Sequence, residues 1–320
     1  MQKTKKITVI IPCLPKQNSG TAVSSLKDID YPKNKIEILI AEGNNPSRQR
    51  NLAIDQATGE ILFFFDDDAE IPRDYLKKAM HHYENEGVDA LGGPVETSKE
   101  SPFLQKCFGY VIGSYFATQS MSNKFKGHGK TRTATEKELI LCNFSMRRKS
   151  LGDKRFDERL YPNEENELYN RLISEGKNLV YNPSLKVYRK QRDSIHKFAK
   201  QFFKYGYSRV EHLLIRPSSI SPVFLVPPIF VIYLLTIIGL SITNQITLPL
   251  IAPIVLYISI SLVIAGIIAT NQKDPKSLLV TPFLFFIVHT TYGLGMMVSL
   301  LNFRKKIRPK EVKIRKIHLK

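Results

Sequence analysis

Two long runs without a charged side chain constrain this 320-residue chain more than any other feature. The first extends from Pro217 to Gln272 and the second from Ser277 to Phe303. Each exceeds the roughly 20 apolar residues that a helix needs to cross the hydrocarbon core of a bilayer. Because a soluble domain of this size offers too little surface to cover such helices, the runs predict transmembrane helices over residues 222–242, 246–270 and 278–302.

The rest of the sequence divides around these runs. We expect a soluble α/β domain over residues 1–192, an amphipathic interfacial helix or linker over 193–216, a transmembrane region over 217–303 and a basic tail over 304–320. The opening MQKTKKITVIIP is basic and then apolar, but its apolar part is short and β-branched, as in a strand and not a signal peptide. We therefore expect a multi-pass protein of the cytoplasmic membrane whose soluble domain stays in the cytosol, with three free cysteines.

The net charge of +18 would suit a nucleic-acid-binding protein. The tail from Arg304 to Lys320, however, carries nine Lys or Arg against one Glu and abuts a predicted span, so we expect membrane lipids as partners and no nucleic acid. The positive-inside rule places this tail in the cytosol, whereas three full spans would place it outside. Either one segment is re-entrant or interfacial, with breaks at Pro227–Pro228 or at Gly293 and Gly295, or the rule is broken. The span count stays open.

Three short apolar runs at residues 7–11, 36–40 and 61–65 predict buried strands of the soluble domain. A helix between the last two runs, ending at Gly59, makes a crossover connection, which implies a parallel twisted sheet with helices on its faces. Ligands of such sheets bind beyond the carboxyl ends of the strands. Asp66, Asp67 and Asp68 directly follow the third run.

Three adjacent aspartates after a buried strand repel one another, and a divalent cation would relieve that cost. Mg²⁺ or Mn²⁺ prefers carboxylate oxygens and keeps positions open for phosphate, so the cluster favours a metal–diphosphate site. The alternative is a plain acidic turn in which Asp66 caps the next segment. Spacing alone does not decide which phosphate chemistry would take place.

A second acidic group lies in the run YPNEENELYNRL, where Asn163 is expected to cap a helix that ends at Gly176. Glu165 shares one face with Leu168 and Leu172, so we expect it to point toward the protein and to be able to act as a general base. The alternative is that acids in a first turn only complement the helix dipole. Farther on, residues 196–217 mix aromatic and cationic side chains, which suits a helix in the membrane interface whose cations either face a diphosphate or serve anchoring alone.

The runs ITVIIP, GEILFFFDDDAEIP, CNFSMRR, YPNEENELYNRL and QFFKYG together resemble the family 2 glycosyltransferases with a GT-A fold. The resemblance covers about residues 6–216 and is strongest to membrane-attached enzymes that build exopolysaccharides, which are distantly similar to cellulose synthase. It implies a GT-A, Rossmann-like mixed α/β sheet with flanking helices, followed by an interfacial helix and C-terminal transmembrane helices. It also implies a nucleotide-sugar donor, with a UDP-sugar favoured.

The same resemblance assigns roles to individual residues. Asp66 and Asp68 take the metal-binding positions of the DxD motif, and Glu165 takes the position of the catalytic base in inverting members. The remaining expected donor-site residues are Pro12, Glu42, Arg50, Asn51, Asp67, Gln201, Lys204 and Tyr205. Of these, Gln201, Lys204 and Tyr205 stand where the synthases carry QxxRW.

This chain departs from the family pattern at Lys204. Lys204 replaces an arginine and cannot grip a diphosphate with two parallel bonds, which weakens the case for a processive polymerase. We therefore expect a single, inverting transfer of a sugar to a lipid-linked or membrane-proximal saccharide. The competing hypothesis is a membrane scaffold or lipid-binding protein with a degenerate transferase domain.

Overall fold

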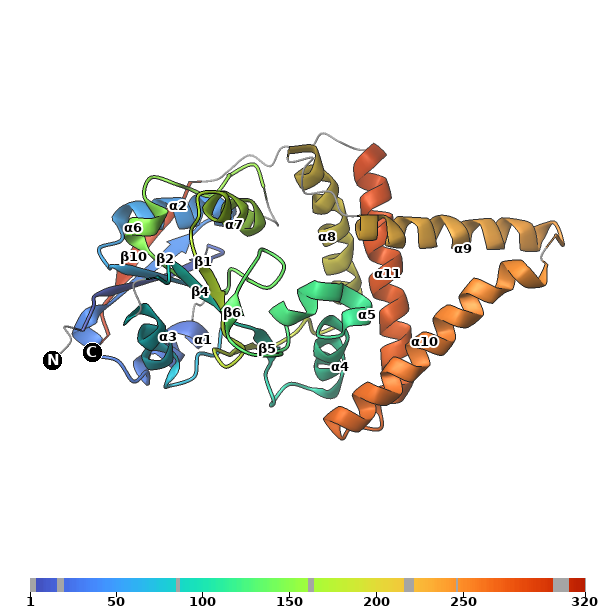
Figure 1. Ribbon diagram of the computed structural model, residues 1–320, viewed down its shortest axis with the longest axis horizontal. Coiled ribbons are helices and arrows are strands. Elements are labelled where there is room, and N and C mark those ends of the chain that lie inside the picture. The colour runs from blue at the N-terminus through green and yellow to red at the C-terminus, as the bar shows by residue number, and fades with distance from the viewer. Residues whose placement is uncertain are drawn as a thin grey trace. The chain divides into compact units, whose positions relative to one another are not determined.

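The computed structural model describes residues 4–15, 20–84, 87–160, 164–215, 222–245, 247–301 and 311–319. They form two compact units, coloured along the chain in Figure 1. The first unit comprises residues 1–100, 120–190 and 306–320, and the second comprises residues 101–119 and 191–305.

An eight-stranded mixed sheet forms the centre of the first unit, in the order β10-β2-β1-β3-β7-β4-β8-β6. The three predicted strands lie side by side and parallel, as β1 (Ile7–Cys13), β2 (Ile36–Glu42) and β3 (Ile61–Phe65). The other members are β4 (Ala90–Gly92), β6 (Arg132–Thr133), β7 (Asn143–Arg147), β8 (Leu179–Tyr181) and β10 (Lys313–Ile317). Since β7 runs antiparallel to β3 and β4, the sheet is mixed. A separate parallel pair joins β5 (Val95–Thr97) to β9 (Val187–Arg189).

Both faces of the sheet are buried because the strands are apolar throughout. All seven residues of β1 are buried, and alternate side chains enter different core clusters. One cluster is completed by α1 (Gly20–Lys27) and α3 (Tyr75–Glu84), the other by α2 (Pro46–Gln56), α6 (Arg148–Leu151) and α7 (Glu164–Ser174). Figure 1 shows these two groups of helices on opposite faces of the sheet. The expected mixed α/β sheet with flanking helices is confirmed.

The end of the basic tail belongs to this sheet. Residues 313–317 form β10, which pairs antiparallel with β2 and covers its outer edge. Arg315 Nη2 lies 3.3 Å from Glu42 Oε1, and the Lys316 ammonium pairs with the buried carboxylate of Glu37. Residues 313–317 of the basic tail therefore form a strand, and contact of the tail with lipids stays a prediction. Residues 302–310 lie outside the described residues.

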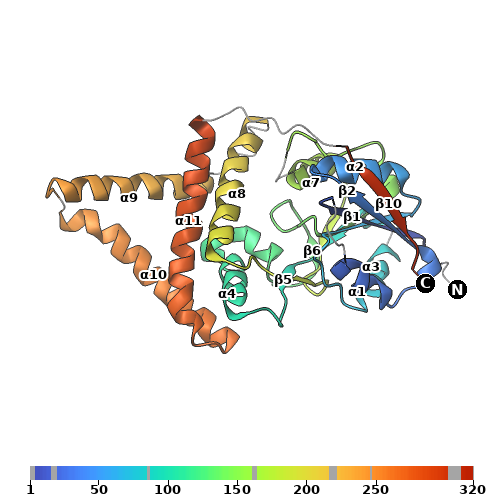
Figure 2. The same ribbon diagram turned by 180° about the vertical axis from the view of Figure 1, so that it is seen from behind.

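The second unit is helical. It contains α4 (Phe103–Ile112), α5 (Tyr115–Thr118), α8 (Ile195–Ile215), α9 (Val226–Ile242), α10 (Leu248–Gln272) and α11 (Ser277–Leu301). Short 3₁₀ turns occupy Lys33–Lys35, Gln119–Lys124 and Pro222–Leu225. Three helical stretches, Pro222–Ile242, Leu248–Gln272 and Ser277–Leu301, are long and apolar enough to cross a membrane, as predicted. Figures 1 and 2 show α8 beside α11, and α9 and α10 diverging from α11 to join at their far ends.

The breaks expected inside these helices are absent from the described segments. Pro227 and Pro228 stand in the first turn of α9, where a missing N–H costs nothing. Gly293 and Gly295 lie within the uninterrupted helix α11. They permit close packing instead, because a Cβ at these positions would come within 2.5 Å of the Pro227 carbonyl oxygen and 2.1 Å of the Phe203 carbonyl oxygen.

Candidate active site

The three aspartates lie at the carboxyl end of β3, at the centre of the sheet. Asp66, Asp67 and Asp68 follow the fully buried Phe65 and are themselves half-buried. Burial raises the pKa of Asp67 to about 6, and repulsion from Asp68 and Asp66 adds to this effect. The cluster therefore concentrates negative charge at the sheet edge where ligands of α/β proteins bind.

Arg189 compensates part of this charge and was not found from the sequence. Its guanidinium lies 3.4 Å from Asp66 Oδ2 and 3.3 Å from Asp68 Oδ2. Strand β9 carries it there, held by reciprocal backbone hydrogen bonds of 2.7 and 3.0 Å between Glu70 and Tyr188. Since Arg189 is 123 residues from Asp66 in sequence, only the pairing of β9 reveals the contact.

Arg50 joins the aspartates to the acidic helix. It is buried on α2, whose first turn is set by the Asn45 cap and Pro46. Its Nη1 lies 3.0 Å from Glu164 Oε1, and its Nη2 lies 3.4 Å from Asp66 Oδ1. The expected donor-site arginine therefore lies between the metal-motif aspartate and the pair of glutamates.

The two glutamates of α7 differ in their surroundings. Glu164 is 3% exposed, whereas Glu165 is half-exposed. Burial raises the pKa of Glu164 to about 8, repulsion from Glu165 adds to this, and attraction by Arg50 opposes it. The expectation that Glu165 is the inward-pointing member is thus corrected. The buried face includes Leu168 and Leu172, as predicted, but the fully buried acid of the first turn is Glu164 and not Glu165. Asn163 lies outside the described residues.

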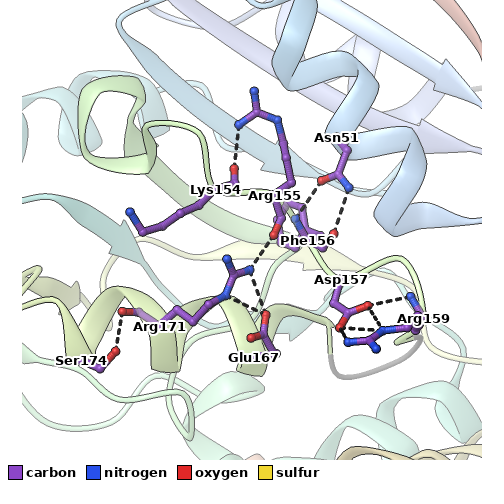
Figure 3. Close-up of polar contacts among 9 residues, drawn as sticks. All are labelled: Asn51, Lys154, Arg155, Phe156, Asp157, Arg159, Glu167, Arg171 and Ser174. Atoms are coloured by element: carbon purple, nitrogen blue, oxygen red, sulfur yellow. Dashed lines mark hydrogen bonds and ion pairs between the residues drawn. The ribbon is translucent and has the colours of Figure 1, made fainter. Parts of the chain in front are cut away.

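Asn51 holds the segment that precedes α7. Its side-chain amide accepts from Phe156 N at 2.8 Å and donates to Phe156 O at 2.9 Å, as Figure 3 shows. In the same view, Arg171 links Glu167 to the carbonyl oxygen of Arg155. These contacts fix residues 154–160 and therefore the start of α7, where the glutamates lie.

Two of the expected donor-site residues lie at the carboxyl ends of β1 and β2. Pro12 pairs in register with Ala41, and the next pair joins Cys13 to Glu42. Glu42 is the carboxylate that β10 reaches through Arg315. The C-terminal strand thus borders this part of the site.

The three expected residues of α8 belong to the second unit. Gln201 donates to Tyr205 Oη at 2.8 Å and accepts from Arg192 Nε at 2.9 Å. Lys204 is exposed. Their contribution to the donor site stays a prediction.

Asp66 and Asp68 suit a divalent ion that draws its other ligands from substrate and water. No group of three or more His, Cys, Asp or Glu side chains is arranged for a metal within the described ranges. Mg²⁺ is commonly held by one or two carboxylates together with substrate phosphates, so two aspartates meet this need. Asp68 Oδ1 is buried without a hydrogen-bond partner, which leaves one carboxylate oxygen available.

Comparison with known proteins gives this site its chemical context. Residues 15–153, from just after β1 to just after α6, match the family described as Glycosyl transferase family 2. The segment that contains the aspartate cluster is therefore similar to family 2 glycosyltransferases. A similar protein is the GalNAc(5)-diNAcBac-PP-undecaprenol beta-1,3-glucosyltransferase of Campylobacter jejuni, 24% identical over 222 residues. That match spans 58% of this chain and 64% of the relative.

One solved structure supports the GT-A fold of this chain. A mannosyltransferase from Pyrobaculum calidifontis, solved with GDP-Man and Mn²⁺, is similar at a TM-score of 0.57 and 17% identity, covering 95% of this chain and 89% of that one. S. aureus TarS 1-349 with UDP-GlcNAc gives a TM-score of 0.45 at 17% identity, covering 97% of this chain and 96% of that one. The suggested similarity to cellulose synthase gains no support from these relatives.

Proposed function

We propose that this glycosyltransferase moves a hexose from a nucleotide-sugar, with UDP-sugars favoured, to a lipid-linked saccharide, with inversion at the anomeric carbon. The observation that carries the proposal is the Asp66–Asp68 cluster linked through Arg50 to the two glutamates of α7. The name of the Campylobacter relative supports a polyprenyl-diphosphate-linked acceptor. The three apolar helices support catalysis beside a membrane, which we place at the cytosolic face of the cytoplasmic membrane.

In this mechanism, Asp66 and Asp68 would hold a Mg²⁺ or Mn²⁺ ion, and that ion would supply charge neutralisation for the leaving diphosphate. Glu165, half-exposed on the first turn of α7, accepts the proton of the acceptor hydroxyl as the oxygen attacks the anomeric carbon. The ion pair of Arg50 with Glu164 fixes the position of α7 relative to the aspartates. Asn51 acts by positioning the segment before α7, and Pro12 and Glu42 border the nucleobase.

Calorimetric titration of the detergent-purified chain with UDP, and in parallel with GDP, tests the proposal. Each titration is run with Mn²⁺ and again after chelation, on wild type, Asp68→Asn and the exposed control Asp153→Asn. We expect metal-dependent binding of one nucleotide that is lost in D68N and kept in D153N. Binding by neither nucleotide, or equal binding by D68N, would contradict the enzyme and favour a scaffold with a transferase fold.

A further inference from the structure

We propose that the chain crosses the membrane twice, through a hairpin formed by α9 and α10, and that α11 lies along the membrane surface on the side of the glycosyltransferase domain. This inference does not depend on which sugar or acceptor the enzyme uses. It concerns how three helices that are each long enough to span are divided between the bilayer and its surface.

The chain returns to the sheet that it left. Residues 120–190 belong to the first unit, residues 191–305 belong to the second, and β10 pairs with β2 back in the first. The pairing is fixed by five register positions, from Lys313–Glu42 to Ile317–Ile38, and by the ion pair of Lys316 with buried Glu37. Two strands that share hydrogen bonds lie on one side of a membrane. The number of full crossings between them is therefore even, and three is excluded.

The segments that connect the apolar helices to the sheet cannot supply a further crossing. Helix α8 has Lys197, Lys200 and Lys204 exposed in its first half. Between α11 and β10, the sequence NFRKKIRPK contains five Lys or Arg in nine residues. Charged side chains are strongly disfavoured in the hydrocarbon core, so the crossings must be chosen among α9, α10 and α11.

Helix α11 is the one that stays outside. Of its apolar window 44% is buried within the protein, against 6% for α9 and 11% for α10. It packs directly on α8: a Cβ at Gly206 would come within 2.0 Å of the Tyr292 carbonyl oxygen. A crossing by α11 would draw the lysines of α8 into the hydrocarbon.

Further contacts tie α11 to the remainder of the helical unit. His289 Nε2 donates to the carbonyl oxygen of Phe116 at 2.9 Å, and its Nδ1 accepts from Tyr257 Oη at 2.9 Å. These bonds join α11 to α5 and to α10. An interfacial position lets α11 keep both these polar bonds and its packing on the cationic helix.

The hairpin of α9 and α10 suits the bilayer core. Its large side chains face outward along both helices, among them Ile229, Leu235, Leu256 and Val263, each between 55% and 64% exposed. Neither helix contains a charged residue, and the span Pro222–Ile242 has 21 residues, about 32 Å at 1.5 Å per residue. The turn between them carries Thr243, Asn244 and Gln245, which suits the far polar surface. Figures 1 and 2 show the two helices converging toward this turn, and Phe230 of α9 also stacks on Tyr257 of α10 with ring centroids 4.7 Å apart.

Single-cysteine labelling of the full chain tests this topology. The three native cysteines are buried and are replaced by alanine, and cysteine is then introduced by Lys77→Cys in α3, Asn244→Cys in the turn or His318→Cys beyond β10. A membrane-impermeant maleimide is applied to intact cells and to inverted vesicles. Labelling in detergent controls for the intrinsic reactivity of each site.

We expect K77C and H318C to be labelled together from one side and N244C from the opposite side, each at least tenfold faster than from the other side. Labelling of K77C and H318C from opposite sides would mean an odd number of crossings and would overturn the proposal. N244C labelled on the same side as K77C, or protected from both sides, would also overturn it, because the hairpin would then not cross. These outcomes are independent of nucleotide binding, so they separate this proposal from the proposed enzymatic activity.

Discussion

Glu37 is the buried charge that should control the stability of the sheet edge. Burial alone would raise its pKa, but hydrogen bonds from Lys316, Thr8 and Thr58 outweigh burial and lower the pKa from 4.5 to about 2. The Thr8 hydroxyl donates at 2.6 Å and the Thr58 backbone N–H at 2.8 Å. Each tenfold change in proton affinity is worth about 1.4 kcal/mol, so the ionised carboxylate stabilises the fold by about 3 kcal/mol at neutral pH.

The sign of the pH dependence follows from the lowered pKa. The contribution is complete above pH 4.5, the ordinary value for the unfolded chain, and is lost as the pH falls toward 2. We therefore expect Glu37→Gln to lower the free energy of unfolding by about 3 kcal/mol at pH 7 and by progressively less below pH 4.5. Lys316→Met should cost at least as much at pH 7, because it leaves a buried carboxylate without its cation.

Urea unfolding in detergent measures this effect. The chain has 14 tyrosines and no tryptophan, so tyrosine fluorescence and far-UV circular dichroism are suitable signals. Glu175→Gln is the matched control, since Glu175 forms an exposed 2.7 Å pair with Lys154 and should change stability by less than about 1 kcal/mol. An E37Q protein as stable as wild type at pH 7, or a loss of equal size at pH 3, would refute the reasoning.

Three further predictions test the site and the anchor. Glu165→Gln should lower kcat by about 10²–10⁴-fold while calorimetric nucleotide binding is kept, with E175Q unchanged in both; lost nucleotide binding would instead indicate a structural role. Gly59→Ala should destabilise the fold by about 2 kcal/mol or more in urea unfolding, since its Cβ would lie 2.4 Å from backbone atoms of Ile7 and Thr8, whereas Gly239→Ala has free space and should not. Leu256→Lys in α10 should reduce the membrane-inserted fraction in carbonate extraction, whereas Leu294→Lys, at an exposed position of α11, should not reduce it. Equal losses in the two variants would contradict an interfacial α11.

The parts of the fold that the sequence predicted are those with a strong local pattern. The apolar runs at residues 7–11, 36–40 and 61–65 became three adjacent parallel strands, and the uncharged runs became long helices. Strand β10 was missed because KIRKI has more charge than apolar character, and only the facing Glu37 and Glu42 explain its cations.

In the candidate site, too, only the residues with a local sequence pattern could be predicted. Asp66 and Asp68 could be found because they follow an apolar strand directly. Arg189 could not, since its contact with them depends on β9 pairing with β5 far along the chain. The inward-pointing glutamate was misplaced by one residue, because neighbours on a helix differ by about 100° and the contact with Arg50 selects Glu164.

Strand β10 also links the order of synthesis to the completion of the sheet. It is the last of the described strands to leave the ribosome, after all three apolar helices have been made. Until then β2 is an open edge, and the Glu37 carboxylate lacks the Lys316 ammonium. The sheet of a nascent chain is therefore completed only after its apolar helices have been synthesised. A chain whose β10 does not pair keeps the edge of β2 and the Glu37 carboxylate unpaired, and this edge is then exposed to chaperones and proteases.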